Sequence, residues 1–487
     1  MLVYVLLEST MLNKFKPFLG RENALTLSFF ELLFQSENND LLLIELQQKL
    51  DISKYKLTVT LTRAQEISSH FSEINLKIGK THVTFSTISY ATFNNLKSYI
   101  ADQSIPFQIF IFNGILRRNT TEEQVQQKLN ISSATYFRIR KRLFNDLNIN
   151  CLDEMQIRFL IFDALTYFNY FDYLIDYNAA DLAPFIALSE DIWDFKLPED
   201  VYRSCAKLLM VNYIRSLTCG VKNVPAKYYL VNYETSKNIQ KFTHRIMYKL
   251  NTSREFAIQS TNMLLIYVLY HGSLPIKNIN HLNNAKEIQG VTSLQLKTAR
   301  EILGNQANIK EFNEFTHNLA AVNAAAILPI VPMQDSISDK TIMWHKESHP
   351  GIDYLSQQLT DILLSHSSQA DDRVLDEKQC RYLFGIYIST TLPANIFEDT
   401  VYLSVNFTQS RLLTQHVLKE CQSLTNLNIV AYEDIDDKTD IYISNTYNPN
   451  FDKPQVIWDN VPEVPDWLNL YKLIIKVKHE KFAIKKH

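Results

Sequence analysis

The heptapeptide QQKLDIS at residues 47–53 returns as QQKLNIS at residues 126–132, an offset of 126 − 47 = 79 residues. The two copies match at six of seven positions, and the seventh exchanges Asp51 for Asn130. Asp and Asn are both at home in tight turns, because their short side chains bond to nearby backbone. The repeat therefore predicts two copies of one local fold in the first third of the chain.

Each copy lies between a short and a longer amphipathic segment. Residues 42–50 and 121–129 place leucine or valine on one face and polar residues on the other, as a surface helix does. Ser53 and Ser132 then stand where a helix N-cap is expected, and apolar residues at helical spacing follow each serine. A short helix, a tight turn and a second helix make a helix-turn-helix, so the sequence predicts two such units.

The second helix of such a unit enters the DNA major groove with its first residues at the base edges. Small hydroxyl side chains reach base edges, whereas cations neutralise phosphates. Residues 138–142 read RIRKR, which is four cations in five residues. We therefore expect double-stranded DNA as a partner. The candidate contacts are Ser53, Lys54, Tyr55, Lys56, Arg63, Ser133, Thr135, Arg138, Lys141 and Arg142.

A small β-hairpin is expected directly after the first unit. Residues 74–87 alternate in polarity around a Gly79-Lys80 turn. A hairpin that follows a recognition helix is a wing, and Lys77, Lys80 and His82 would then face the DNA backbone. A purely structural hairpin with incidental cations is an equally good reading of the same residues.

Composition excludes several classes of protein. The 487 residues are 46% hydrophobic and 21% charged, as in ordinary globular proteins of several domains. Nine glycines without a Gly-rich phosphate loop argue against a nucleotide-driven enzyme. Five cysteines without a CxxC argue against a disulfide framework or a cysteine zinc site. No apolar run approaches the ~18 residues of a membrane span, so we expect a cytoplasmic protein without a membrane, metal or cofactor.

Charge is distributed unevenly along the chain. Residues 1–150 carry 17 Lys and Arg against 13 Asp and Glu, a net of +4. The remainder carries 49 − 17 = 32 against 52 − 13 = 39, a net of −7. A basic N-terminal part followed by an acidic remainder is typical of a nucleic-acid-binding module attached to domains of another kind.

The middle of the chain, from about residue 155 to residue 392, shows helical periodicity and predicts two helical bundles. It contains no HExxH and no GxSxG, so no catalytic constellation stands out and we expect no enzyme. The tail changes pattern. Strands are expected at residues 401–406, 427–432, 440–444 and 455–458, with helices at 410–422 and from 466, which indicates a small parallel α/β sheet.

This order of parts, together with the paired QQKL-Asx-IS turns, resembles the Mga-type virulence regulators of Gram-positive bacteria, a group that includes AtxA-like proteins. The resemblance implies a mainly α, multidomain fold. The expected domains are a winged helix-turn-helix (1–90), a second helix-turn-helix (91–160), two helical phosphotransferase-system regulation domains, or PRDs (161–283 and 284–394), and a tail similar to the EIIB component of sugar phosphotransferase systems (395–487).

The resemblance also implies a function, namely a transcriptional regulator under phosphotransferase-system control. His271 and His317 are then candidate phosphorylation sites, and phosphocarrier proteins are candidate partners. A homodimer is expected in which residues from about 395 onward contribute contact area. Active EIIB domains carry a cysteine directly after the first strand, and residues 406–410 contain none. The alternative is a phosphocarrier of that pathway, or a sensor or scaffold, without direct DNA binding.

Overall fold

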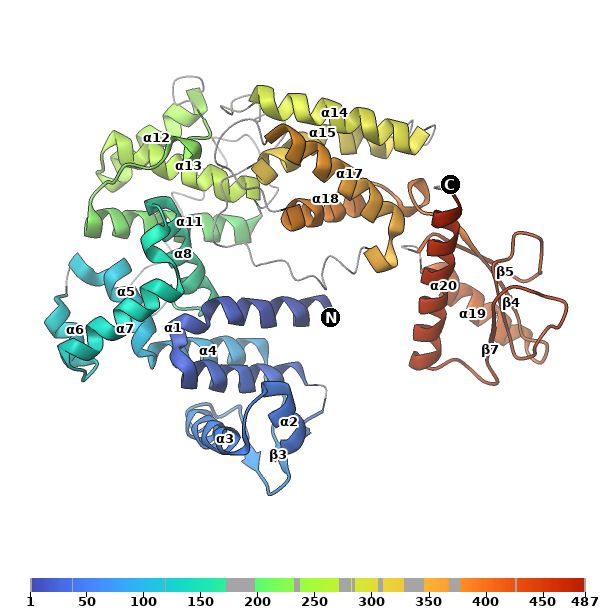
Figure 1. The fold of residues 1–487 in the computed structure, drawn as a ribbon, viewed down its shortest axis with the longest axis horizontal. Helices are drawn as coiled ribbons and strands as arrows, with labels where there is room; N and C mark the ends of the chain where they lie inside the picture. The colour runs from blue at the N-terminus through green and yellow to red at the C-terminus, as the bar shows by residue number, and fades with distance from the viewer. Residues whose placement is uncertain are drawn as a thin grey trace. The chain divides into compact units, whose positions relative to one another are not determined.

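The computed structural model describes residues 2–36, 38–118, 120–171, 198–231, 237–270, 282, 285–304, 310–327, 346–367, 377–424 and 427–485. Over these residues the protein is mainly helical, with a small parallel sheet near the C-terminus (Figure 1). The chain forms two compact units, one built mainly from residues 1–273 and the other from residues 274–328 and 337–487. Each unit is described by itself.

The first unit consists of helices and one small antiparallel sheet. Helices α2, α3, α6 and α7 lie where the repeat predicts them, whereas α1 was not predicted. The described helices are α1 (Leu2–Gln35), α2 (Leu43–Leu50), α3 (Lys54–Ser68), α4 (Tyr90–Asp102), α5 (Ile105–Gly114), α6 (Glu122–Lys128), α7 (Ser133–Asp146), α8 (Glu154–Tyr167), α11 (Glu199–Cys219), α12 (Lys237–Leu250) and α13 (Arg254–Tyr270), with 3-10 turns at Leu116–Arg118, Ile149–Cys151 and Ala226–Tyr228.

Helix α1 packs against both α4 and α5. It bends at Gly20, whose φ of 69° and ψ of 170° are not helical. A residue with a Cβ adopts this positive φ only with strain, so glycine allows the bend. Beyond the bend, Phe34 stacks on Phe93 of α4 at 4.7 Å between ring centroids. Before it, Phe18 meets Phe110 of α5 at 4.6 Å. Aromatic packing therefore holds α4 and α5 to the two halves of α1.

The repeated heptapeptide forms the same turn in both copies. Asp51 and Asn130 each have a φ of 51°, in the left-handed region. The amide of the following isoleucine donates to the carbonyl five residues earlier, at 3.2 Å in the first copy and 3.0 Å in the second. This hydrogen bond closes a helix C-terminus. Asn and Asp tolerate the left-handed conformation better than most residues, so the one exchange in the repeat preserves the turn.

The same turn occurs a third time, between α12 and α13, where residues 249–253 read KLNTS. Asn251 has a φ of 47°, and the amide of Thr252 again donates to the carbonyl five residues earlier, at 3.1 Å. The hydroxyl of Ser253 accepts from the amide of Phe256 at 3.2 Å. Here the second helix, α13, is buried along most of its length. The turn is therefore a general connection between helices, and its copies differ in how far the second helix is exposed.

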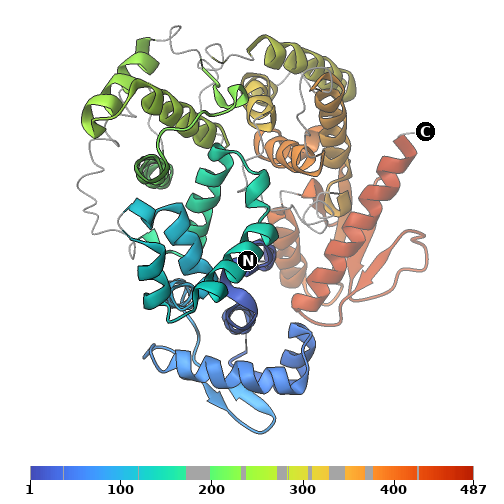
Figure 2. The same cartoon turned by 60° about the vertical axis from the view of Figure 1, so that its left-hand side comes forward.

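The predicted hairpin is present and is part of a three-stranded sheet. Strands β2 (Lys77–Ile78) and β3 (His82–Thr84) pair antiparallel, and the amide of Gly79 donates to the carbonyl of His82 at 2.8 Å. Strand β1 (Asp40–Leu42), which was not predicted, pairs with the other edge of β3, giving the order β1-β3-β2. Figures 1 and 2 show α2, α3 and this sheet together at one end of the first unit.

The second unit joins a helical bundle to an α/β tail. Helices α14 and α15 pack against α17 and α18 around a core that includes one polar contact, in which the amide of Asn323 donates to Gln295 at 2.6 Å. The described elements are α14 (Ala285–Leu303), α15 (Lys310–Ile327), α17 (Pro350–Ser367), α18 (Glu377–Thr391), the 3-10 turn Ala394–Ile396, β4 (Val401–Asn406), α19 (Arg411–Ser423), β5 (Ile429–Tyr432), β6 (Ile441–Ser444), β7 (Gln455–Ile457) and α20 (Val464–Lys485).

The tail forms a four-stranded parallel sheet, as the sequence predicts, and the structure gives its strand order as β5-β4-β6-β7. Leu403 of β4 and Ile443 of β6 point to the same face, where Val417 of α19 and Ile474 of α20 cover them. Leu412 of α19 lies outside this core and is 80% exposed.

A buried ion pair ties the tail to the bundle. Glu398 and Lys478 are at most 1% exposed and lie 3.6 Å apart. The same carboxylate accepts from the amide of Gly351 at the start of α17, at 3.1 Å. Burial raises the pKa of Glu398 and lowers that of Lys478. Bundle and tail are thus joined through α20 rather than separated by an exposed linker.

Several expected domain boundaries fall inside elements of the structure. The boundary after residue 160 lies within α8, the one after residue 90 within the first turn of α4, and the one after residue 394 within a 3-10 turn. The boundary after residue 283 lies outside the described residues, near the division between the two units at 273 and 274. The first three expected domains therefore share one compact unit.

Candidate nucleic-acid interface

Helix α3 is positioned by its N-cap and its apolar face. The hydroxyl of Ser53 accepts from the amide of Lys56 at 3.4 Å, so this candidate side chain also caps the helix. Lys54, Tyr55 and Lys56 are exposed, as predicted, and Tyr55 is 78% exposed. The buried face consists of Leu57, Leu61, Ala64 and Ile67. This periodicity leaves the first turn of α3 exposed to solvent.

The structure shows that Arg63 is engaged by helix α1. Its side chain is 33% exposed, and the guanidinium lies 3.3 Å from the carboxylate of Glu22 on α1. A second nitrogen donates to the side-chain oxygen of Asn23. Arg63 therefore ties α3 to α1 instead of projecting freely. Sequence periodicity placed it outward, but the covering residues are 40 and 41 positions away.

Helix α7 is anchored by a buried tyrosine. Tyr136 is fully buried, and its hydroxyl accepts from the side-chain amide of Asn113 on α5 at 3.1 Å. Burial raises the pKa of Tyr136. Ser132 caps the helix by accepting from the amide of Thr135 at 3.2 Å and also donates to the Thr135 hydroxyl. Ser133 remains exposed, whereas Thr135 is half-buried and engaged in the cap.

The cations of α7 separate into paired and unpaired groups. Arg140 lies 3.7 Å from Glu122 of α6 and packs over the ring of Phe144, so it stabilises the local contact between α6 and α7. Arg142 forms an exposed ion pair with Asp146, one turn along, at 3.5 Å. Exposed pairs of this kind are weak and exchange easily. Arg138 and Lys141 are exposed and form no ion pair with any described residue.

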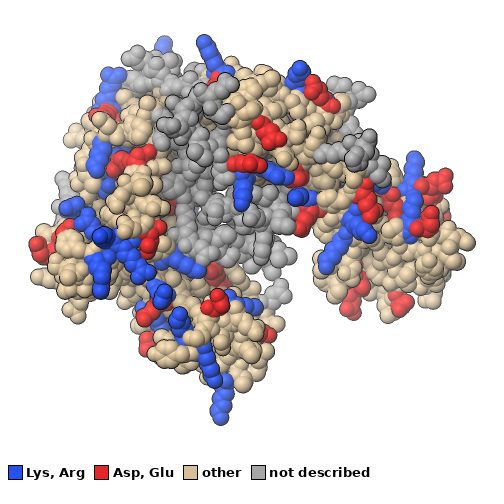
Figure 3. Space-filling view, viewed as in Figure 1, with Lys and Arg blue, Asp and Glu red and all other residues tan. Residues whose placement is uncertain are grey.

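A groove of about 940 Å³ lies between α1, α3 and α7, so the two repeated units contribute to one surface. Six cations and three acids line it, an excess of three positive charges. They are Lys16, Arg21, Lys49, Lys56, Arg63 and Arg142, with Glu22, Glu31 and Asp146. Figure 3 shows Lys and Arg side chains over α7 that continue toward α3 and the hairpin. Lys16 and Arg21 were missed because α1 had no predicted place beside the repeat, and Lys49 was missed although it lies on α2 within the repeat itself.

The hairpin extends this surface. Lys77, Lys80 and His82 are all exposed on the strands and the turn between them. The hairpin follows α3 directly and pairs through β3 with β1, which leads into α2. Its cations are therefore carried on the same small body as α3.

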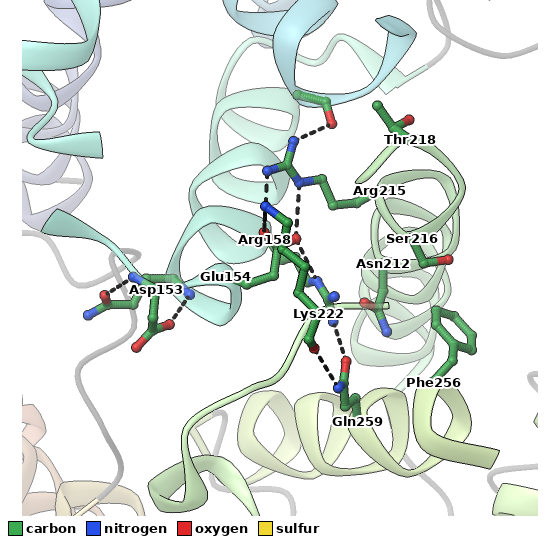
Figure 4. Close-up of polar contacts among 12 residues, drawn as sticks. Asp153, Glu154, Arg158, Asn212, Arg215, Ser216, Thr218, Lys222, Phe256 and Gln259 are labelled. Atoms are coloured by element: carbon green, nitrogen blue, oxygen red, sulfur yellow. Dashed lines mark hydrogen bonds and ion pairs between the residues drawn. The ribbon is translucent and has the colours of Figure 1, made fainter. Parts of the chain in front are cut away.

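A cluster of buried ions connects α8, α11 and α13 and was not predicted (Figure 4). The carboxylate of Glu154 on α8 accepts from Arg158 at 3.2 Å and from Arg215 on α11 at 3.0 and 3.3 Å. The Arg158 side chain is 0% exposed, and burial lowers its pKa. A second nitrogen of Arg158 donates to Gln259 of α13 at 3.2 Å. One carboxylate thus holds three helices together.

The same cluster is connected to α7 through α5. Arg215 donates to the carbonyls of Asn113 and Gly114 at the C-terminus of α5, at 3.1 and 3.2 Å. A cation is favourable there because helix carbonyls point toward it. Asn113 is also the residue that holds Tyr136 of α7. A continuous set of contacts therefore runs from α7 through α5 to α11, α8 and α13.

The candidate phosphorylation sites cannot be placed on this framework. His271 lies outside the described residues, and His317 lies on α15 with a side chain outside the described part of the structure. Cys421, the cysteine of the tail, is buried within α19, and burial raises its thiol pKa to about 12. A thiol with that pKa stays protonated at cellular pH and is a poor nucleophile.

The described residues contain no group of three or more His, Cys, Asp or Glu side chains arranged to hold a metal ion. None of the described helices combines the length and the apolar character that crossing a bilayer requires.

Neither the comparison with protein-family models nor the comparison with curated proteins returns a match for this chain.

Proposed function

We propose that the protein is a DNA-binding transcriptional regulator. In this proposal α2–α3 and α6–α7 act as two helix-turn-helix units, and the β2–β3 hairpin acts as a wing. The observation that carries the proposal is that α3 and α7 both line one groove with an excess of positive charge. A duplex presents a dense row of phosphates, and a surface with this charge attracts it.

The exposed side chains of α3 and α7 suggest which residues contact phosphates and which contact bases. Arg138 and Lys141, exposed and without an ion pair among the described residues, are suited to phosphates. Ser133 and Tyr55 are exposed at the starts of the two helices, where base edges would lie. Short side chains read few base edges, so we expect modest sequence specificity assisted by DNA shape.

The order of parts supports a regulator resembling the Mga type. In that reading the helices of residues 161–283 and 284–394 correspond to PRDs, and the parallel sheet of residues 395–487 corresponds to an EIIB-like domain. The protein would then work in the cytoplasm under control of the sugar phosphotransferase system. Incubation with the phosphocarrier proteins of that system should label the protein, and His271→Ala with His317→Ala should remove the label.

The alternative, a phosphocarrier without DNA binding, is less well supported. The loop at residues 406–410 that follows β4 has no cysteine, and Cys421 is buried with a raised thiol pKa. The tail is better suited to assembly. Val464 is 82% exposed and Leu468 52% exposed on the first turns of α20, and apolar side chains in such positions favour self-association.

The dimer part of the proposal has its own test. Val464→Glu with Leu468→Glu in the full chain should shift the mass measured by light scattering from dimer toward monomer, because charge is costly in an apolar contact. A dimer that persists would move the contact away from this part of α20.

DNA binding is tested by fluorescence anisotropy with a duplex of about 40 base pairs, long enough for both units. The logarithm of the binding constant should fall linearly with the logarithm of salt concentration between about 0.05 and 0.2 M. The slope is proportional to the number of phosphate contacts. A protein that leaves the duplex unbound at the lower salt concentration would overturn the proposal.

A further inference from the structure

Helix α12 carries a row of cations on its exposed side. Lys237, Lys241, Arg245 and Lys249 follow one another at intervals of four residues, and all are exposed. The helix reads KNIQKFTHRIMYKL and contains no acidic residue. Four residues of α-helix rise about 6 Å, so the charges form a regular line along one face. Tyr248, 86% exposed, lies beside this line.

The opposite face of α12 is already occupied. Ile239, Phe242 and Ile246 are buried, and α12 packs against α13. The hydroxyls of Thr243 and Thr261 meet at 3.1 Å across that contact. A free basic amphipathic helix can insert its apolar face into a membrane or a protein groove. Here that face is unavailable, so a partner can be held only through the charged side.

The three lysines on this side are not neutralised within the described part of the protein. Lys237, Lys241 and Lys249 form no ion pair with a described residue. Three lysines of one sign at close spacing repel one another, which is unfavourable for the free protein. A partner with a row of negative charges removes that repulsion.

We infer that the exposed face of α12 binds the phosphate backbone of the DNA, as a contact additional to α3, α7 and the hairpin. This inference rests on the proposed function. Neighbouring phosphates on one strand lie about 3.4 Å apart along the axis, and farther apart in space because the strand winds round it. The regular interval along α12 suits such a row better than the irregular charges of an acidic protein. Helix α12 also belongs to the same compact unit as α3 and α7.

The test compares two triple variants with equal change in net charge. Lys237→Gln, Lys241→Gln and Lys249→Gln remove the row, and glutamine keeps the helix because its helix propensity is close to that of lysine. Lys286→Gln, Lys297→Gln and Lys472→Gln remove three exposed lysines from α14 and α20 of the other unit and serve as the control. Circular dichroism and the unfolding temperature establish that both variants fold like the wild type.

Anisotropy titrations of a duplex of about 60 base pairs, at several salt concentrations, give the readout. The α12 variant should lower the salt slope by about 2 to 3, since each lost phosphate contact removes about 0.9, while the control leaves it unchanged. An α12 variant with the wild-type slope overturns the inference and leaves the proposed function standing. A wild type that does not bind overturns both.

Discussion

Arginines gather in two places in the first unit, and the two places differ in almost every physical respect. On α7, Arg138 and Arg142 are exposed, and the acid beside Arg142 is exposed as well. Around Glu154, Arg158 and Arg215 are buried and share one carboxylate. Arginine is suited to both settings, since its planar guanidinium stays charged and donates several hydrogen bonds.

The contrast shows that the solvent around an arginine, not the residue type, determines what it does. Exposed guanidinium groups on α7 lose little by exchanging water for phosphate, so they are available to a partner. Buried ones have already given up their water and depend on Glu154, so they are structural. In the proposed function the first cluster binds DNA, and the second maintains the geometry that presents it.

The largest effect on stability is expected for Arg215→Ala, which removes one of the two buried arginines that share Glu154. Removing Arg215 takes hydrogen-bond donors away from the buried Glu154 carboxylate and from the carbonyls of Asn113 and Gly114, so the free energy of unfolding of the first unit should fall by about 3 kcal/mol. Helix α11 supplies a matched control in Arg203, which forms an exposed pair with Glu199. Arg203→Ala should cost about 0.5 kcal/mol or less. Equal shifts of the two variants in denaturant unfolding would show that burial does not separate the clusters.

The exposed side is tested by replacing Arg138, Lys141 and Arg142 of α7 with alanine together. Affinity for duplex DNA should fall about 10²-fold at 0.1 M salt, and the salt slope should drop by about 2 to 3. Stability should change little, because these side chains are exposed. Wild-type affinity and slope in this variant, measured by anisotropy, would take α7 out of the interface.

A smaller effect on stability is expected for Ser132→Ala, a variant that distinguishes a residue that caps α7 from one that binds DNA. Ser132→Ala removes the acceptor for the amide of Thr135, so the free energy of unfolding should fall by about 1 kcal/mol. The cap contributes no charge, and the salt slope for DNA should stay at the wild-type value. A changed slope would mean that Ser132 contacts the duplex as well as capping the helix.

The smallest effect is expected for Arg63→Ala, because Glu22 and Asn23 already engage that guanidinium. The salt slope should change by well under one unit, whereas Lys56→Ala on the same helix should lower it by about 0.9. The pair of titrations sharpens the distinction between a cation that faces the partner and one that faces its own protein. Equal slopes for the two variants would restore Arg63 to the interface.

Local features of this protein follow from its sequence alone. The left-handed turns at Asp51 and Asn130, the caps Ser53 and Ser132 and the four tail strands all appear where pattern and residue type predict them. These features depend on interactions between residues a few positions apart, so a short window of sequence contains their cause.

The sequence also indicated which residues of α3 and α7 would face inward, since helical periodicity carries that information. Residues 249–253 (KLNTS) resemble the repeat, but nothing in the sequence showed that the helix after this third turn is buried, or that α1 forms one wall of the groove. Both facts concern which surface another element covers. Periodicity separates faces of a helix but does not say what lies against them.

Tertiary structure alone decided the roles of the arginines. Arg63 meets Glu22 across 41 positions, and Arg215 meets Asn113 across 102. The sequence specified that cations exist on α3, α7 and α11, and the periodicity specified their side of each helix. Whether each charge remains in water or pairs with a distant carboxylate depends on how the helices pack. Burial multiplies the strength of a charge interaction, so that packing decides which arginines hold the fold and which remain for a partner.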